Sequence, residues 1–423
     1  MTSPRPRSAE GAIGRASGHL LVFAVAFGIA VSRRPDALLH AQFSAEGGTV
    51  FFAEAYNYGL ASTFMPVPHA GYLQIFQRLI ALLASLFPLS AAPLVVNVVS
   101  LALIVLPVSL LLSSRFDYIG RVPVRALIAF GYLALPSSVE VFANLAATGV
   151  HMTILAVMLL CASPADRPGW KIFDVVVLVL FSLAGATVIL LVPIAIIVWW
   201  FRRQRWLLMQ ILALLPGAVA QGLVILLTIQ NMRTSATAPL GATPTLFVEI
   251  LARQMFVAPL LGMRVPLPGD GQIAAMFSTA VVCLGAAAMA YCLLNAPMGL
   301  RFFVGFSAVL VAAALRFPLC SLTTPQWQVM VAPGACNRYW LIPMLSFLVS
   351  LGWIAYARTG WLQLTAVLTL LIMPVGIIRD WRHPAWADQQ FAARAQEFAA
   401  APRGTHMVFP IAPPGWFMEL VKQ

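Results

Sequence analysis

Residues 91–113 read Ala91-Ala-Pro-Leu-Val-Val-Asn-Val-Val-Ser-Leu-Ala-Leu-Ile-Val-Leu-Pro-Val-Ser-Leu-Leu-Leu-Ser113, a stretch without a single charged side chain. About 20 apolar residues are enough for a helix to cross the hydrocarbon core of a bilayer. The stretch therefore predicts a membrane-spanning helix. The whole chain has the same character, since 61% of its 423 residues are hydrophobic and 9% are charged, whereas a soluble domain has about 25% charged residues. A large soluble catalytic domain is excluded.

Apolar blocks of this kind recur along the chain, separated by polar residues or by Pro and Gly. The expected fold class is an all-α polytopic membrane protein with about 11 transmembrane helices, within a range of about ten to twelve. The blocks at 173–184 and 186–200 meet at Gly185 and could instead form one bent helix, which would lower the count by one. The predicted spans lie near residues 16–32, 91–113, 126–142, 149–163, 173–184, 186–200, 207–229, 273–296, 300–317, 338–357 and 360–378.

The chain carries a formal net charge of +12. In a membrane protein such a surplus flanks the spans, so we expect membrane lipids and no nucleic acid as partners. The short basic loops 115–125, 167–171 and 202–205 fall on one side of the predicted topology, which places them and the N-terminus in the cytoplasm and the C-terminus in the periplasm. The first apolar run resembles a signal peptide, but we expect an anchor helix. The preference for Arg over Lys and the many Ala and Leu residues are typical of a bacterium with a GC-rich genome, which predicts a location in the bacterial inner membrane.

Two segments outside the predicted spans are long enough to have structure of their own. The first outer loop, 33–90, is rich in aromatic residues, which predicts interfacial helices along the membrane surface, although its part 71–89 could also cross the membrane. The segment 379–423 follows the transmembrane domain 1–378 and is predicted to be a small extracytoplasmic cap. The cap is expected to contain a helix over 388–400, a strand over 406–411 and a turn at 413–415.

Carboxylates are scarce, and one at the edge of a bilayer is costly unless it is paired or hydrated, so those outside the membrane are candidate functional groups. Glu46 lies in Phe43-Ser-Ala-Glu-Gly-Gly-Thr-Val-Phe-Phe52, where two glycines let the backbone approach a ligand closely. We predict Glu46 as the reactive carboxylate, with Glu54 as the alternative. The predicted outer carboxylates are Asp36, Glu46, Glu54, Glu140, Glu249 and Asp270.

Five short motifs and the tail, in this order, resemble the GT-C superfamily of polytopic glycosyltransferases, which use polyprenyl-phosphate-linked sugars. The motifs are Arg33-Arg34-Pro35, Phe43-Ser-Ala-Glu46-Gly-Gly, Gly71-Tyr-Leu-Gln-Ile-Phe-Gln-Arg78-Leu, Pro136-Ser-Ser-Val-Glu140-Val-Phe-Ala-Asn144 and Asn337-Arg338-Tyr339-Trp340, followed by Phe409–Trp416. The resemblance implies inverting transfer of a sugar to a glycan, lipid or protein acceptor of the cell envelope, with Glu46 as general base. Many members have adjacent acids where this chain has Glu46-Gly47, which leaves open whether Glu46 or Glu54 is the base and whether a divalent metal takes part.

The implied reaction needs cations for the departing phosphate, and the planar guanidinium suits that role. The outer arginines Arg33, Arg34, Arg78 and Arg338 are therefore predicted to bind substrate, with Tyr339 beside the last of them. Arg78 could instead pair with Glu54, and Arg338 could simply snorkel to the interface. Further candidate substrate contacts are Glu54, Glu140 and Asn144, the last two one helical turn apart, and the histidines His69 and His151. A capping role for Glu140 and Asn144 and a passive interfacial role for the histidines are alternatives.

Of the five cysteines, Cys320 and Cys336 share the outer loop that leads into Arg338. A disulfide there would fit an oxidising periplasm, with two free thiols as the alternative. No His, Cys and Asp cluster has the spacing of metal ligands, so no cofactor is predicted. A transporter or lipid flippase is the main alternative function, and an assembly protein of the envelope is a third. A transporter would place its polar residues in broken helices near the bilayer midplane.

Overall fold

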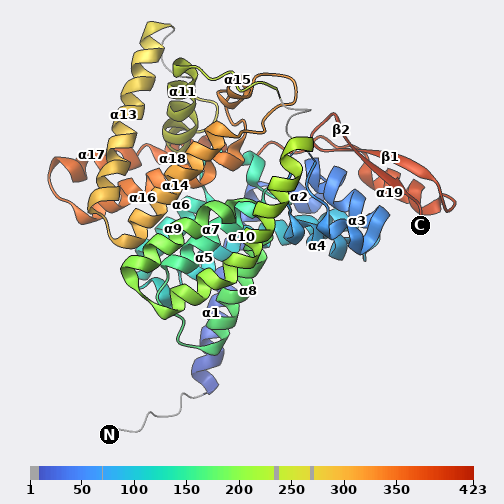
Figure 1. The fold of residues 1–423 in the computed structure, drawn as a ribbon, viewed down its shortest axis with the longest axis horizontal. Helices are drawn as coiled ribbons and strands as arrows, with labels where there is room; N and C mark the ends of the chain where they lie inside the picture. The colour runs from blue at the N-terminus through green and yellow to red at the C-terminus, as the bar shows by residue number, and fades with distance from the viewer. Residues whose placement is uncertain (1–8, 69, 233–237, 267–270) are drawn as a thin grey trace.

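The computed structural model describes residues 9–68, 70–232, 238–266 and 271–423. The chain is mostly helical (Figure 1). The main helices of the bundle are α1 (Ala9–Arg33), α5 (Ala92–Leu111), α6 (Val122–Leu133), α7 (Thr148–Cys161), α8 (Pro168–Ser182), α9 (Thr187–Arg202), α10 (Arg205–Met232), α13 (Gln272–Asn295), α14 (Met298–Arg316), α16 (Leu341–Ala357), and the consecutive α17 (Trp361–Leu370) and α18 (Met373–Asp380).

Among the described residues, six helices are long and apolar enough to cross a membrane. Within α13 only 17% of the most apolar window is buried inside the protein, although its mean hydropathy is 2.0. Large apolar side chains such as Leu284 and Leu227 are exposed on these helices. Apolar surfaces of this size are unfavourable in water and are expected to face lipid. The chain is therefore a multi-pass α-helical membrane protein.

One of the six candidate spans was not expected from the sequence. Residues Pro244–Leu261 form α11 (Pro244–Ile250), the π-helical η5 (Leu251–Val257) and α12 (Ala258–Leu261) without interruption, whereas no span was predicted between 207–229 and 273–296. The mean hydropathy of this helix is only 1.3, because it contains Glu249 and Arg253. The apolar pattern of the sequence therefore did not reveal it. Several other predicted spans are apolar helices of 10–17 residues.

The blocks on either side of Gly185 are two helices rather than one bent helix. Asp174 in α8 accepts hydrogen bonds from Trp206 and Gln210 near the start of α10, and Ser182 at the end of α8 lies against Gly217 farther along α10. Helices α8 and α10 therefore run in the same direction. Helix α9 lies between them in the sequence and returns the chain.

The first outer loop folds into short elements: α2 (Asp36–Leu39), the π-helical η1 (Gly47–Phe52), α3 (Ala53–Tyr58), the 3₁₀ helix η2 (Gly59–Phe64) and α4 (Ile75–Ala84). Ten residues of helix rise about 15 Å, half the thickness of the hydrocarbon core, so α4 is too short to cross. The remaining short elements are η3 (Ser114–Phe116), η4 (Val139–Val141), α15 (Gln326–Met330) and η6 (Asn337–Tyr339).

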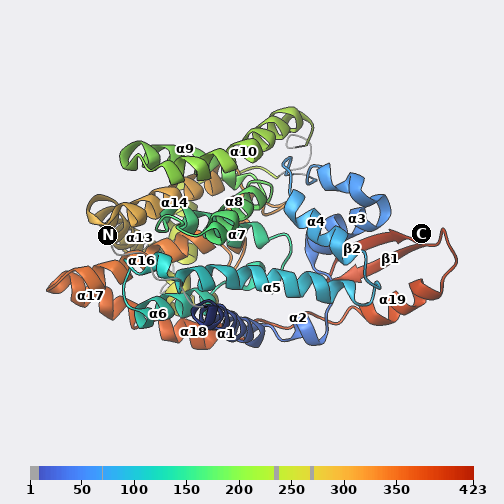
Figure 2. The same cartoon turned by 90° about the horizontal axis from the view of Figure 1, so that it is seen from below.

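The C-terminal segment contains α19 (Phe391–Ala400) and an antiparallel hairpin of β1 (His406–Ile411) and β2 (Trp416–Val421), in which His406 pairs with Val421 and Ile411 with Trp416. The first strand and the turn lie where the sequence predicted them, and the second strand is an addition to the all-α fold class. Figure 2 shows α3, α4, α19 and the hairpin gathered at one end of the molecule. Phe43, Phe391 and Phe409 are buried where the cap packs on the first outer loop.

Candidate functional site

Glu46 is half-buried at the start of η1. A π-helical turn is uncommon and is often found at functional sites. The residue before it, Ala45, has a φ of 45°, a left-handed conformation that a non-glycine residue rarely adopts. Among the described residues, no side chain or backbone group donates a hydrogen bond to the Glu46 carboxylate. Glu54 and Glu140, by contrast, are both engaged in ion pairs.

Arg338 lies in η6, close to Glu46. Its Nη1 pairs with the Glu140 carboxylate and its Nη2 donates to the Leu319 carbonyl. Burial lowers the pKa of Arg338, but the negative charge of Glu140 and a smaller contribution from Glu46 raise the pKa above its ordinary value. Three residues predicted separately from the sequence, Glu46, Glu140 and Arg338, therefore form one charged cluster.

The backbone on both sides of Arg338 is fixed. The Tyr339 hydroxyl accepts a hydrogen bond from Leu319 N at 3.0 Å, and the Arg338 guanidinium lies 5.1 Å from the Tyr339 ring centre. Cys320 and Cys336, which the sequence singled out as a pair, are joined by a disulfide with their Cα atoms 6.0 Å apart. The disulfide therefore ties the segment that carries Leu319 to the segment that carries Arg338.

Asn144 contributes to the shape of the loop that carries Glu140. Its Nδ2 donates to the Glu140 carbonyl at 3.0 Å and its Oδ1 accepts from Ala146 N at 3.1 Å. These local bonds are the capping arrangement that was the alternative to substrate binding. Of the two histidines, His151 is buried between Tyr132 and the Val141 carbonyl, and His69 lies outside the described residues, as does Asp270.

Glu54 and Arg78 form a second pair. Arg78 in α4 is completely buried and bonds to Glu54 through Nη1, while Glu54 keeps about a fifth of its side chain exposed. The Nε and Nη2 atoms of Arg78 are buried and have no hydrogen-bond partner within the described part of the chain, and the guanidinium lies 5.6 Å from the Phe51 ring centre. The pairing that the sequence analysis held as an alternative for Arg78 is therefore present.

Arg33 lies in a cage of main-chain carbonyls. Its guanidinium donates to the carbonyls of Leu133, Leu135, Asp380 and Trp381 and to the Ser138 hydroxyl, at 2.6–3.2 Å. These five bonds use every donor that a guanidinium has. Arg33 therefore has none to offer a phosphate here, and the structure does not bring it together with Glu46.

Arg34 is also buried, against Trp386 and the carbonyls of Phe142 and Pro384. Both arginines face His383. Burial, together with the smaller effect of the positive charges of Arg33 and Arg34, lowers the pKa of the His383 imidazole to about 2. This imidazole is therefore neutral across the physiological pH range. Arg33, Arg34 and His383 pack together where the end of α1 meets the cap.

One carboxylate that was not among the predicted candidates, Asp380, has a structural role. Asp380 Oδ2 accepts hydrogen bonds from Ser137 N at 2.9 Å and Met263 N at 2.7 Å, and the Ser137 carbonyl accepts from Asn337 Nδ2 at 2.6 Å. Asp380 thus supports the loops that carry Glu140 and Arg338. No sequence signal other than the scarcity of acids pointed to it, because its partners are distant in the chain.

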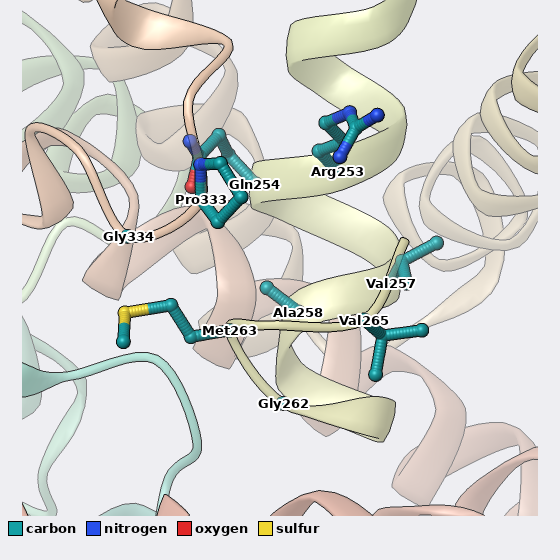
Figure 3. A pocket seen from close by; sticks show the side chains of 9 residues that line it. All are labelled: Arg253, Gln254, Val257, Ala258, Gly262, Met263, Val265, Pro333 and Gly334. Carbon is teal, nitrogen blue, oxygen red and sulfur yellow. The ribbon is translucent and has the colours of Figure 1, made fainter. Parts of the chain in front are cut away.

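A small pocket lies beside the segment that precedes Arg338 (Figure 3). Gln254 lies at its wall next to Pro333, and its Nε2 donates to the carbonyls of Met330 and Ala332, both at 2.7 Å. The pocket is lined by Arg253, Gln254, Val257, Ala258, Gly262, Met263, Val265, Pro333 and Gly334.

No protein-family model matches this chain, and a search of curated proteins gave no match. Within the described ranges, no group of three or more His, Cys, Asp or Glu side chains could hold a metal ion. The function must therefore be inferred from the residues of the site.

Proposed function

We propose that the chain is a glycosyltransferase of the bacterial inner membrane, which moves a sugar from a polyprenyl-phosphate donor to an envelope glycan, lipid or protein acceptor on the outer face. The proposal rests on the GT-C resemblance of its motifs and on one observation. Of the carboxylates in the cluster, Glu46 alone, among the described residues, has oxygens that accept no hydrogen bond, and it interacts electrostatically with Arg338.

Glu46 has the properties that a general base needs. A base must have a lone pair within reach of the acceptor hydroxyl and must remain ionised. The ion pairs of Glu54 and Glu140 occupy their carboxylates. The Glu46 carboxylate is half-buried and accepts no hydrogen bond from the described residues. These features favour Glu46 over Glu54 as the base.

The reaction then follows from these roles. Glu46 takes the proton of an acceptor hydroxyl, the acceptor oxygen attacks the anomeric carbon, and the bond from that carbon to the phosphate oxygen breaks. The phosphate leaves with the bonding electron pair, and the configuration at the anomeric carbon is inverted. Arg338, held by Glu140 and the Leu319 carbonyl, supplies positive charge near the departing phosphate.

The proposal is tested by comparing the lipids and glycans of cells that contain the protein, cells that lack it and cells that carry Glu46→Gln. Cells lacking the chain should lose one sugar substituent and accumulate its lipid-linked donor in the outer leaflet. Glu46→Gln should behave like the deletion while its amount in the membrane stays normal. Donor that accumulates in the inner leaflet would instead identify a flippase, and unchanged profiles in the deletion would remove the transferase proposal.

A further inference from the structure

We propose that the C-terminal hairpin is a positioning element for the Glu46 carboxylate, an inference that rests on the proposed function. The hairpin lies about 360 residues after Glu46 in the sequence, yet it forms the support on which the Glu46 turn is built.

The two segments are joined through their backbones next to the candidate base. Ala45 N donates to the Ala412 carbonyl at 2.7 Å, and Ala412 N donates to the Phe43 carbonyl at 3.1 Å. Ser44 and Ala412 form a parallel bridge. These bonds flank Ala45, whose left-handed φ of 45° persists only where the surrounding structure enforces it. The hairpin thus fixes the direction in which Glu46 leaves the turn.

The side-chain packing is equally close on the other side of Glu46. A Cβ atom at Gly48 would lie 2.7 Å from Cδ1 of Ile411 and 2.8 Å from Cβ of Phe43. Ile411 is fully buried in β1, so the backbone of η1 lies directly on the hairpin. The glycine at this position is therefore explained by contact with the cap rather than by a need for contact with a ligand.

Polar bonds hold the second strand to the same segment. Thr49 Oγ1 donates to the Phe417 carbonyl at 2.8 Å. Asn57 bonds to β2 through both ends of its amide, since Nδ2 donates to the Glu419 carbonyl at 3.0 Å and Oδ1 accepts from Val421 N at 3.0 Å. Contacts therefore extend from Phe43 through η1 into α3, and the hairpin supports the whole segment that begins at Glu46.

The test uses the full chain with Gly48→Ala, the double variant Gly48→Ala/Ile411→Val, and Gly222→Ala as control. A Cβ at Gly222 meets no atom of the described residues within 4 Å. Hydrogen exchange of residues 43–52 in detergent should increase in Gly48→Ala, return part of the way in the double variant, from which Cδ1 of residue 411 is absent, and stay unchanged in the control. This readout does not depend on the proposed function.

The same variants are then assayed for transfer, with donor lipid extracted from cells that lack the chain. A displaced group of about 1 Å can cost about 100-fold in rate, so kcat of Gly48→Ala should fall by about 10- to 100-fold with KM nearly unchanged, and should partly recover in the double variant. Unchanged exchange, or normal kcat in Gly48→Ala while Glu46→Gln is inactive, would overturn the positioning role. Normal transfer by Glu46→Gln would instead overturn the proposed function.

Discussion

The replacement Asp174→Asn should destabilise the protein strongly. Asp174 is completely buried, and its oxygens accept from Arg115 Nη1 at 2.5 Å, Arg115 Nη2 at 2.8 Å, and Trp206 Nε1 and Gln210 Nε2 at 3.0 Å each. Asparagine would replace one acceptor oxygen with a donor amide that faces other donors. It would also leave the guanidinium of Arg115, which is 5% exposed, without a counter-charge. Breaking a buried pair in this way costs about 3–5 kcal/mol.

The chain contains a matched control for this prediction. Asp117 pairs with Arg125 at 2.6 Å, but its side chain is 63% exposed. Arg125 also donates to the carbonyls of Gly120, Leu111 and Ser113, so Asp117→Asn should cost less than about 1 kcal/mol. Free energies of unfolding in detergent–denaturant mixtures would compare the two variants. Equal effects, or a loss below about 1 kcal/mol for Asp174→Asn, would refute the assigned roles.

Two further predictions concern packing and pH. Gly376→Ala should cost about 1–3 kcal/mol, because its Cβ would lie 2.6 Å from the Leu260 carbonyl oxygen and 2.8 Å from Gly262 N. Gly352→Ala, whose Cβ would have no described atom within 4 Å, should stabilise its helix by up to about 1 kcal/mol. Melting curves that ranked the two variants the other way would contradict the packing of α18 on α12. The pKa of His383 is about 2 in the folded state and about 6.5 in the unfolded state. Below about pH 6.5 the unfolded state therefore binds a proton that the folded state does not, and the free energy of unfolding falls by about 1.4 kcal/mol per pH unit. The acid dependence of unfolding should therefore become shallower in His383→Leu, and an unchanged slope would exclude this residue as its cause.

The sequence predicted the membrane class, the short helices of the first outer loop and the first strand of the hairpin, because hydropathy and turn residues are local signals. It missed the helix over Pro244–Leu261, since Glu249 and Arg253 interrupt its apolar pattern. It also assigned Arg33 to phosphate binding, whereas the carbonyls that surround Arg33 come from residues about 100 and about 350 positions away. Such a cage is decided by tertiary packing and leaves no local signal.

In the candidate site, too, the residue types could be predicted from the sequence, whereas the contacts set by tertiary packing could not. Glu46, Glu140 and Arg338 were chosen for their charge and their place in outer loops, and the fold brings them together. The support of the Glu46 turn by Ile411 and Ala412 could not be predicted, because it joins segments at opposite ends of the chain.

Transfer by purified Glu46→Gln tests the central claim most directly. Glutamine keeps the size of the side chain and removes its basicity, and loss of a general base typically costs about 10²- to 10⁴-fold in rate. With donor lipid extracted from cells that lack the chain, Glu46→Gln should bind the donor as the unaltered protein does and lose turnover by at least about 100-fold. Near-normal turnover by Glu46→Gln, with turnover lost in Glu54→Gln, would assign the base to Glu54 and contradict the role proposed for Glu46.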